Sequence, residues 1–330
     1  MLDSVVLESL ELIRVAVIGV GFMGFNHARV YAELSREGVP VELTAAVDID
    51  YARAEKVCRI YGCKPYQDYR DVIGVVDAVS IAVPTTLHYR VAMDFIRNGV
   101  HVLVEKPIAS TTREAMEMVK EAERNNIILL VGHIERFNPA VMKLRELIGR
   151  GVLGDVVTMN AKRVGPLPPR VRDVGVTIDL AIHDVDVMSF ITGFKPLRVY
   201  AKTRNILHPA RVDDVSIILL EFESNVIGIV ETNWLTPYKL RRLTVVGSKA
   251  VAELDYIKQD LLYYDREVEA RVRVDREEPL KRELRHFINC VRGVEKPLVP
   301  GIEGLRALVV VEAALESARE GSPISIPLEF

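Results

Sequence analysis

The stretch that decides the fold is IRVAVIGVGFMG, residues 13–24. Its first six residues are apolar apart from one arginine, which is typical of a buried strand. The glycines at positions 19, 21 and 24 then follow as G-x-G-x-x-G at the point where a helix begins. In that context the first glycine makes a tight turn, the second lets a pyrophosphate approach the backbone, and the third lets helix and strand pack closely. The stretch therefore predicts a dinucleotide-binding turn, with negative charge held at the amino terminus of the helix.

Asp48 supplies the second half of this predicted site. It follows the next apolar strand, Leu43–Val47, at the spacing of an acid that binds ribose. Its carboxylate can accept from the ribose hydroxyls and would repel a 2′-phosphate, so we expect NAD to be preferred over NADP. A cluster of turn glycines with a surface Asp is the alternative, and the agreement of strand, spacing and acid argues against it. The predicted cofactor contacts in this region are Gly19, Gly21, Phe22, Met23, Gly24 and Asp48.

The amino-terminal half alternates short apolar strands with helices. Such alternation predicts βαβ units, and the uninterrupted apolar strands fit a parallel sheet covered on both faces. The expected strands are Ile13–Ile18, Leu43–Val47, Ala78–Val83, Val100–Val104 and Ile127–Val131. The expected helices are Met23–Arg36, Tyr51–Tyr61, Leu87–Asn98 and Thr111–Asn125. We predict an α/β Rossmann domain over residues 1–136.

The carboxyl-terminal half has runs of strands and few helices, which indicates an α+β domain with a large, mostly antiparallel open sheet. The expected strands are Asp155–Val164, Leu197–Thr203, Val212–Glu221, Val226–Thr232, Leu240–Val246 and Ala250–Leu254. The expected helices are Val176–Ile191, Leu280–Val291 and Ile302–Arg319. We predict that residues 137–330 form a domain for substrate binding and oligomerisation, with the last helix packed back on the first domain.

Composition and charge limit the class of protein. The chain has 330 residues, enough for two domains, and its 49% hydrophobic and 27% charged residues are typical of a globular protein. A formal net charge of −3 gives no electrostatic footprint for nucleic acid or an anionic membrane. No apolar run reaches the roughly 20 residues that span a bilayer, and residues 1–12 do not resemble a secretory signal. We expect a cytoplasmic protein with reduced thiols at Cys58, Cys63 and Cys290, because the spacing of the first two is not that of a C-x-x-C pair.

A second group of residues is predicted to carry the chemistry. Lys106 lies in the tripeptide EKP directly after an apolar strand, where open α/β sheets place ligand-contacting groups. Asp179 and His183 lie at positions i and i+4 of an expected helix, and Asp186 falls on the same stripe among mostly apolar neighbours. A buried helix usually turns such a stripe toward a partner or a cavity. A Lys, a His and an Asp together with a dinucleotide suggest hydride transfer to or from an alcohol carbon.

Alternatives stay open for this helix. A satisfied His–Asp pair in the core would give the same pattern, and Lys106 is the residue that argues against it. His183 and two acids could bind a divalent ion, but no second His stands at ligand spacing, so no metal is predicted. For hydride transfer, His183 is the predicted general base and Lys106 the positive charge beside the developing alkoxide. Asp179 would orient His183 or bind substrate.

The chain resembles the glucose–fructose oxidoreductase and inositol dehydrogenase family of NAD(P)-dependent oxidoreductases. The motifs that carry the resemblance follow the family order across most of the chain. They are Gly19–Gly24, Pro84-Thr85-Thr86-Leu87-His88, Glu105-Lys106-Pro107, Arg136-Phe137-Asn138-Pro139, and Asp179 through His183. The resemblance implies a Rossmann domain, an α+β domain with a large open sheet, and a nicotinamide in the cleft between them. It places Lys106, Asp179 and His183 at catalytic positions and implies a cis bond between Lys106 and Pro107.

The resemblance also extends the predicted cofactor site along the chain. The added contacts are Pro84, Leu87, His88, Glu105 and Lys106. His88 would line the nicotinamide pocket, and a histidine on a helix surface is the rival interpretation. For Arg136, which follows an apolar strand, a substrate contact in the cleft competes with an interdomain salt bridge.

The substrate prediction depends on the loop of residues 163–173. Pro and Gly stiffen this loop, and its arginines could bind a diphosphate or carboxylate as forked donors, with ordinary surface charges as the alternative. The predicted substrate contacts are Arg136, Arg163, Arg170, Arg172, Asp179 and His183. The loop and the segment 132–139 resemble the UDP-N-acetylglucosamine 3-dehydrogenase branch of the family, which forms a 3-keto nucleotide sugar. We therefore predict an NAD-dependent enzyme that oxidises a secondary hydroxyl of a sugar, with UDP-N-acetylglucosamine as substrate.

Two rival functions stay open. One is a free-sugar or inositol dehydrogenase of the same family, and the other is a non-catalytic NAD-binding regulator, which would need no base at position 183. The strand-rich region 197–254 has one face for helices and still carries Val and Ile on the other, so a homodimer or homotetramer is expected, as the family commonly forms. Neither a nucleic acid nor a membrane is expected as a partner.

Overall fold

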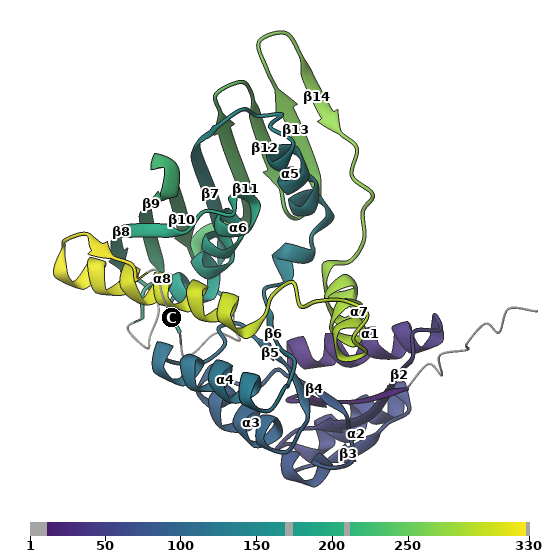
Figure 1. The fold of residues 1–330 in the computed structure, drawn as a ribbon. Helices are drawn as coiled ribbons and strands as arrows, with labels where there is room; N and C mark the ends of the chain where they lie inside the picture. The colour runs from purple at the N-terminus through teal and green to yellow at the C-terminus, as the bar shows by residue number, and fades with distance from the viewer. Residues whose placement is uncertain (1–11, 169–173, 208–211, 328–330) are drawn as a thin grey trace, which may run out of the picture. The chain divides into compact units, whose positions relative to one another are not determined.

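The computed structural model describes residues 12–168, 174–207 and 212–327 (Figure 1). The chain forms two compact units. Unit 1 contains the residues up to 105 together with 118–130 and 283–298, and unit 2 contains residues 106–117, 131–282 and those from 299 onward. The domain boundary predicted at residue 136 stays a prediction.

A six-stranded sheet in the order β3-β2-β1-β4-β5-β6 belongs to the first half of the chain. The pairs from β3 through β5 are parallel, and the strands β1, β4 and β6 are buried along almost their whole length. The strands are β1 (Ile13–Ile18), β2 (Val41–Val47), β3 (Lys64–Tyr66), β4 (Ala78–Ile81), β5 (His101–Glu105) and β6 (Leu129–Gly132). The helices of this half are α1 (Phe22–Arg36), α2 (Tyr51–Tyr61), α3 (Thr85–Arg97) and α4 (Thr112–Arg124). This confirms the predicted Rossmann fold and adds the short strand β3, whose lysine and proline gave no strand signal.

The expectation of three reduced thiols was wrong. Cys58, in the last turn of α2, and Cys63, just before β3, form a disulfide. Gly62 ends α2 in the left-handed conformation, which reverses the chain and brings the two cysteines together. The C-x-x-C spacing does not reveal a bond that closes across the end of a helix, as this one does. Cys290 is a free, buried cysteine.

A nine-stranded sheet belongs to unit 2, in the order β14-β13-β12-β11-β7-β10-β9-β8-β15. Its pairs are antiparallel except for β7 with β10, which confirms the predicted mostly antiparallel sheet. The strands are β7 (Val156–Pro166), β8 (Pro196–Arg204), β9 (Val215–Phe222), β10 (Ile227–Asn233), β11 (Leu235–Gly247), β12 (Val251–Asp255), β13 (Asp260–Tyr264), β14 (Glu269–Val272) and β15 (Ile324–Ser325). Of these, β13, β14 and β15 were not predicted, and β11 begins earlier than expected.

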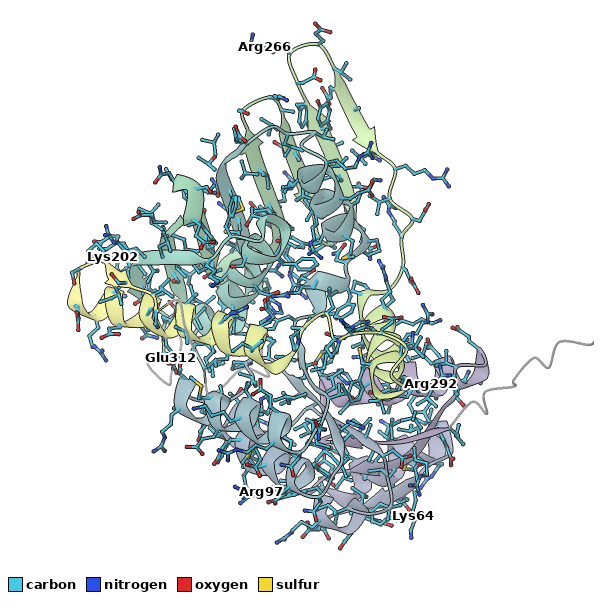
Figure 2. The ribbon with its side chains drawn as sticks, in the orientation of Figure 1. Lys64, Arg97, Lys202, Arg266, Arg292 and Glu312 are labelled. Atoms are coloured by element: carbon cyan, nitrogen blue, oxygen red, sulfur yellow. A yellow bond between two sulfur atoms is a disulfide. The ribbon has the colours of Figure 1, made fainter. Side chains whose placement is uncertain are left out.

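Helices cover one face of this sheet. The helix α5 (Pro139–Gly149) contacts β12 and β13, and α6 (Ile182–Thr192) contacts β7 and β10 (Figure 1). The long helix α8 (Gly301–Glu320) packs along β8 and against α6. Glu312 of α8, labelled in Figure 2, accepts a hydrogen bond from the backbone N–H of Thr112 at 3.1 Å. The predicted contact of this last helix with the first domain stays a prediction. The remaining helix, α7 (Pro279–Val291), lies mostly in unit 1.

The helix predicted at Val176–Ile191 differs in one respect that matters for the site. It starts as a π-helical turn, Thr177–Ala181, and continues as α6 from Ile182. A π-turn holds an additional residue per turn, so the side chains before and after it do not keep α-helical spacing. None of the helices in the described ranges is long and apolar enough to cross a bilayer.

Candidate active site

The glycine turn between β1 and α1 leaves room where a dinucleotide needs it. Gly19 has a φ of +82°, a left-handed conformation that favours glycine, and an added Cβ would lie 2.8 Å from the carbonyl oxygen of Ala82. At Gly24 an added Cβ would lie 1.8 Å from the carbonyl oxygen of Gly19, so only glycine lets α1 begin this close to β1. At Gly21 an added Cβ would meet no atom within 4 Å. The open space at Gly21, at the amino terminus of α1, fits a pyrophosphate.

The Asp48 carboxylate is fixed at the end of β2 by backbone donors. The N–H of Val20, in the glycine turn, donates to Oδ2 at 3.0 Å, and the N–H of Asp50 donates to Oδ1 at 2.9 Å. The residue is buried, and each of its oxygens retains a further lone pair. Asp48 is thereby tied to the glycine turn and keeps acceptor capacity for two ribose hydroxyls, which fits the predicted role.

The remaining predicted cofactor residues of unit 1 lie at helix starts and strand ends. Phe22 opens α1 and is 68% exposed, and Met23 beside it is half-buried. Pro84 is exposed directly before α3, and Leu87 lies half-buried in the first turn of that helix. Their contact with a cofactor stays a prediction.

His88 and Glu105 are held by hydrogen bonds within unit 1. His88 is buried and its Nε2 donates to the carbonyl oxygen of Val83 at 3.0 Å, so the rival interpretation of a surface histidine was wrong. Glu105 ends β5, and its Oε1 lies 3.0 Å from Nε2 of His27, a fully buried residue of α1. The bond from His27 gives the Glu105 carboxylate a defined orientation at the strand end.

Lys106 and Asp179 form a close ion pair within unit 2. The Nζ of Lys106 donates to Oδ1 of Asp179 at 2.7 Å and to its backbone oxygen at 2.7 Å. The side chains are only 15% and 10% exposed, so the charges are largely desolvated and attract strongly. The peptide bond between Lys106 and Pro107 is cis, as the family resemblance implied.

The π-helical turn that carries Asp179 is capped by Asp213, an acid 36 residues from Thr177 that has no local sequence signal for this role. Oδ2 of Asp213 accepts from the backbone N–H of Thr177 at 2.8 Å and from its hydroxyl at 2.6 Å. An added Cβ at Gly175 would lie 1.8 Å from Oδ1 of Asp213, so glycine is needed for this approach. Asp213 therefore fixes where the turn begins and, through it, where Asp179 lies.

His183 lies in the first turn of α6, four residues after Asp179. The charge of Lys106 acts on it electrostatically. Burial lowers the pKa of His183 well below its ordinary value of 6.5, and the positive charges of Lys106 and Arg163 lower it further. Its Nδ1 is buried and makes no hydrogen bond with another described residue. The imidazole is therefore neutral near pH 7, the state that a general base requires. The structure thus brings the three predicted catalytic residues into one electrostatic neighbourhood.

Arg163 is a structural charge at the centre of a buried network. Its Nε donates to Asp184 at 2.7 Å and its Nη1 to Glu135 at 2.9 Å, and the guanidinium stacks on the Tyr256 ring at 4.7 Å. Burial alone would lower the pKa of Arg163, but the two carboxylates raise it, so it is fully charged. The structure does not support the predicted diphosphate contact by Arg163, because its side chain is 1% exposed and already paired.

Arg136 is likewise buried and paired with carboxylates. Its guanidinium donates to Asp186 at 2.7 Å and to Glu303 at 2.8 Å, and its side chain is 5% exposed. This position does not support a direct substrate contact. The ion pairs that the structure shows for Arg136 lie within unit 2, where they join α6 to the start of α8. Arg170 and Arg172 lie outside the described residues.

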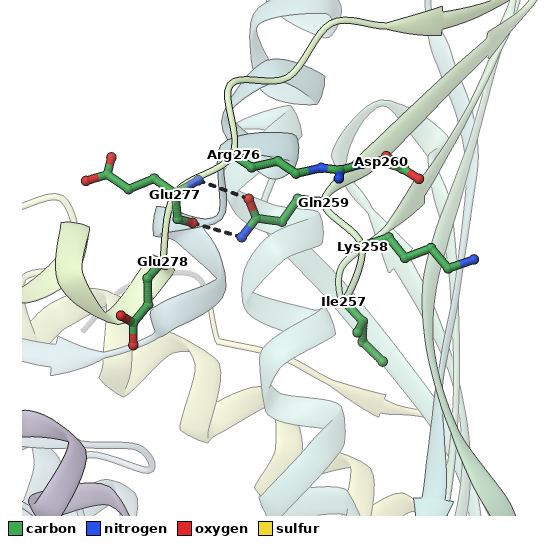
Figure 3. Close-up of a pocket in the computed structure, with 7 residues that line it drawn as sticks. All are labelled: Ile257, Lys258, Gln259, Asp260, Arg276, Glu277 and Glu278. Carbon is green, nitrogen blue, oxygen red and sulfur yellow. Dashed lines mark hydrogen bonds and ion pairs between the residues drawn. The ribbon is translucent and has the colours of Figure 1, made fainter.

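A surface hollow elsewhere in unit 2 contains none of the predicted site residues (Figure 3). It lies beside the turn after β12, where the side chain of Gln259 donates to the backbone oxygen of Glu277 at 2.8 Å and accepts from its N–H at 3.2 Å. These bonds tie the turn to the segment that precedes α7. Within the described ranges, no group of three or more His, Cys, Asp and Glu side chains is placed to hold a metal ion.

Two family models match this chain. One is described as an oxidoreductase family with an NAD-binding Rossmann fold and matches residues 13–133, and the other is the GFO/IDH/MocA C-terminal domain and matches residues 141–253. The chain belongs to the GFO/IDH/MocA family of oxidoreductases. The matches confirm the predicted family, the fold class and NAD as the cofactor.

Relatives of known name cover almost the whole chain. UDP-N-acetylglucosamine 3-dehydrogenase from Acidithiobacillus ferrooxidans is 28% identical in an alignment of 320 residues, which covers 92% of this chain and 98% of that protein. The scyllo-inositol 2-dehydrogenase (NAD(+)) of Bacillus subtilis is 27% identical in an alignment of 339 residues, which covers 96% of this chain and 97% of that protein. A solved structure of the Acidithiobacillus enzyme aligns with a TM-score of 0.85 at 27% identity and covers 93% of this chain and 98% of that one.

Proposed function

We propose that this oxidoreductase oxidises a secondary hydroxyl of a sugar, with UDP-N-acetylglucosamine as substrate and its 3-keto form as product. The observation that carries the reaction type is the half-buried, neutral His183 next to the Lys106–Asp179 pair. The similarity to UDP-N-acetylglucosamine 3-dehydrogenase supports the substrate. Inositol dehydrogenases of similar identity support the second candidate, a free-polyol dehydrogenase.

The chain's own residues have separate tasks in this proposal. His183 takes the proton of the sugar hydroxyl, because its lowered pKa keeps the imidazole unprotonated. Lys106 places an ammonium group beside the developing alkoxide, in surroundings where its charge is poorly screened by water. Asp179 holds the Lys106 ammonium through the 2.7 Å bond and thereby sets its position. The glycine turn and Asp48 would hold NAD, which would supply the hydride acceptor for the sugar carbon. A regulator that only binds NAD would need none of these three groups.

The test is a screen of NAD reduction against UDP-sugars, free sugars and inositols. We expect turnover with UDP-N-acetylglucosamine and a loss of about 10²- to 10⁴-fold in His183→Ala, as for removal of a general base. Added imidazole should restore part of the rate in that variant, which a folding defect would not allow. NADH formation with inositols alone would favour the second candidate, and none with any polyol would contradict the enzyme proposal.

The acid limb of the pH profile tests the role of His183 separately. Because burial and Lys106 lower the pKa of His183, kcat/KM should stay on its plateau below pH 6.5 and fall only in more acidic solution. An acid limb at or above 6.5 would show that another group is the base.

We also propose a homo-oligomer formed through the open face of the nine-stranded sheet. The residues that point away from α5 and α6 include Ile217 and Leu219 of β9 and Ile227 of β10, which are 53%, 47% and 44% exposed. Register places Leu219 and Ile227 on neighbouring strands, so they form part of one apolar face. A monomeric mass by light scattering at micromolar concentration would contradict this proposal.

We propose a cytoplasmic location, and the disulfide between Cys58 and Cys63 raises the question of whether this bond forms there. Such bonds are rare in cytosolic proteins outside hyperthermophiles. Alkylation of thiols in intact cells, followed by mass spectrometry, should find Cys58 and Cys63 bonded and Cys290 free if the bond forms where the protein works. Alkylated Cys58 and Cys63 would show that the bond is absent in the cell.

A further inference from the structure

Arg241 lies opposite Arg163 on the covered face of the nine-stranded sheet. The register of β11 and β7 pairs the two residues directly. Like charges placed opposite each other on neighbouring strands repel. Arg163 is completely buried, whereas the Arg241 side chain is 37% exposed. Arg241 is therefore the arginine of this pair that a ligand can reach.

The carboxylates nearby are used by Arg163. Both oxygens of Asp184 accept from Arg163, at 2.7 and 3.2 Å. Oε1 of Glu135 lies 2.9 Å from Arg163 and 3.9 Å from Arg241, and the longer distance exceeds that of a hydrogen bond. The Arg241 guanidinium thus makes no hydrogen bond with another described residue, and its forked donors remain available.

The surroundings of Arg241 favour the arrival of an anion. Burial, and then the charge of Arg163, lower the pKa of Arg241 below its ordinary value, while Glu135, Asp184 and Asp179 raise it only in part. The same guanidinium contributes to the lowered pKa of His183, so it lies within electrostatic reach of the proposed base. A bound anion would offset the repulsion between the two arginines and could do so close to the reacting hydroxyl.

We propose that Arg241 binds an anionic group carried by the substrate and so selects phosphorylated or carboxylated sugars over neutral ones. This inference rests on the proposed function. It gives Arg241 the anion contact that the sequence predicted for Arg163. A guanidinium offers two parallel N–H donors to a phosphate or carboxylate, which a neutral hydroxyl cannot match in charge. The anion can come from a nucleoside diphosphate, a sugar monophosphate or a sugar carboxylate, which present the same chemistry.

The test compares Arg241→Gln with Arg242→Gln. Arg242 is the next residue of β11, points to the opposite face, is 56% exposed and lies 3.8 Å from Asp255, so it controls for loss of charge on this strand. Wild type and both variants are assayed with UDP-N-acetylglucosamine, N-acetylglucosamine 1-phosphate, glucuronic acid and N-acetylglucosamine. The readout is the ratio of kcat/KM for each anionic sugar to that for the neutral sugar.

We expect Arg241→Gln to lower this ratio by about ten- to a hundred-fold for at least one anionic sugar, through KM more than kcat. Arg242→Gln should leave the ratio within about two-fold of wild type. Arg241→Lys should recover only part of the preference, because a single ammonium lacks the fork. The anionic sugar whose ratio falls most identifies the source of the anion.

An unchanged ratio in Arg241→Gln for every anionic sugar would overturn the inference while leaving the dehydrogenase proposal intact. A binding measurement tests the role of Arg241 even if the dehydrogenase proposal fails. Calorimetry with UDP should show affinity that is lost in Arg241→Gln and kept in Arg242→Gln, even if wild type turned over none of these sugars. If none of these sugars is turned over, equal UDP affinity in all three proteins, or no UDP affinity in any of them, would overturn the inference.

Discussion

The Lys106–Asp179 pair allows stability and catalysis to be separated by a double-mutant cycle. Lys106→Met and Asp179→Asn each remove one charge and leave the other in a setting where only 15% or 10% of the side chain reaches solvent. Breaking a buried pair in this way costs about 3–5 kcal/mol, and the residual exposure places each single variant near the lower end, about 3 kcal/mol. The double variant removes both charges, so it should lose far less than the sum of the two single losses.

Trp234 provides a local probe for this cycle. It is the single tryptophan of the chain and packs with Val176 and Leu180, next to the turn that carries Asp179. Urea unfolding followed by Trp234 fluorescence therefore reports on unit 2, which contains both charges. NAD reduction is measured on the same four proteins.

We expect stability to recover in the double variant and turnover to stay absent, because Lys106 is needed at the alkoxide. Additive losses of about 6 kcal/mol would refute the coupling of the two charges. Turnover within a few-fold of wild type in Lys106→Met would remove Lys106 from the mechanism, whatever the stability data show.

Three further predictions concern unit 1. Replacing Cys58 and Cys63 by Ser should lower the free energy of unfolding by about 2 kcal/mol, because the disulfide closes a loop with a separation of 5 residues, and equal urea midpoints would contradict this. Glu283 is fully buried, and burial followed by the charge of Glu105 raises its pKa well above 4.5. The native state therefore keeps a proton that the unfolded chain releases, so stability should fall by up to about 1.4 kcal/mol per pH unit above 4.5, and Glu283→Gln should flatten that slope in urea titrations at several pH values. Parallel slopes for Glu283→Gln and wild type would show that Glu283 ionises normally. Finally, Asp48→Ser should raise kcat/KM with NADP relative to NAD, and an unchanged cofactor ratio would exclude Asp48 from the ribose site.

The cofactor half of the site could be predicted from sequence because its signals are local. The glycines at 19, 21 and 24 need particular backbone conformations, and Asp48 follows the neighbouring strand at a fixed spacing. The three residues predicted to be catalytic have sequence signals of the same local kind, because Lys106 directly follows a strand and Asp179 and His183 fall in one expected helix. Each of these inferences depends on one element or two neighbouring ones.

The parts that could not be predicted depend on residues far apart in the chain. The sequence around Arg163 is typical of a loop that binds a ligand through arginines. Only the tertiary structure shows that Glu135 and Asp184 neutralise this arginine. Arg241 carries no local signal at all, since its position follows from the register of β11 with β7. The π-helical turn could not be predicted because hydrophobic periodicity does not reveal one additional residue in a turn. Its cap could not be predicted either, because Asp213 lies in a loop far away in the sequence.

The most direct test of the proposed hydride transfer uses UDP-N-acetylglucosamine deuterated at carbon 3, with NAD and the wild-type protein. We expect the deuterium to be transferred to the nicotinamide ring of NADH and a 3-keto nucleotide sugar to accumulate. Both products should form about 10²- to 10⁴-fold more slowly in His183→Ala. Deuterium in the solvent, or no NADH with this sugar while another polyol is oxidised, would contradict the substrate and the hydride path proposed for this site.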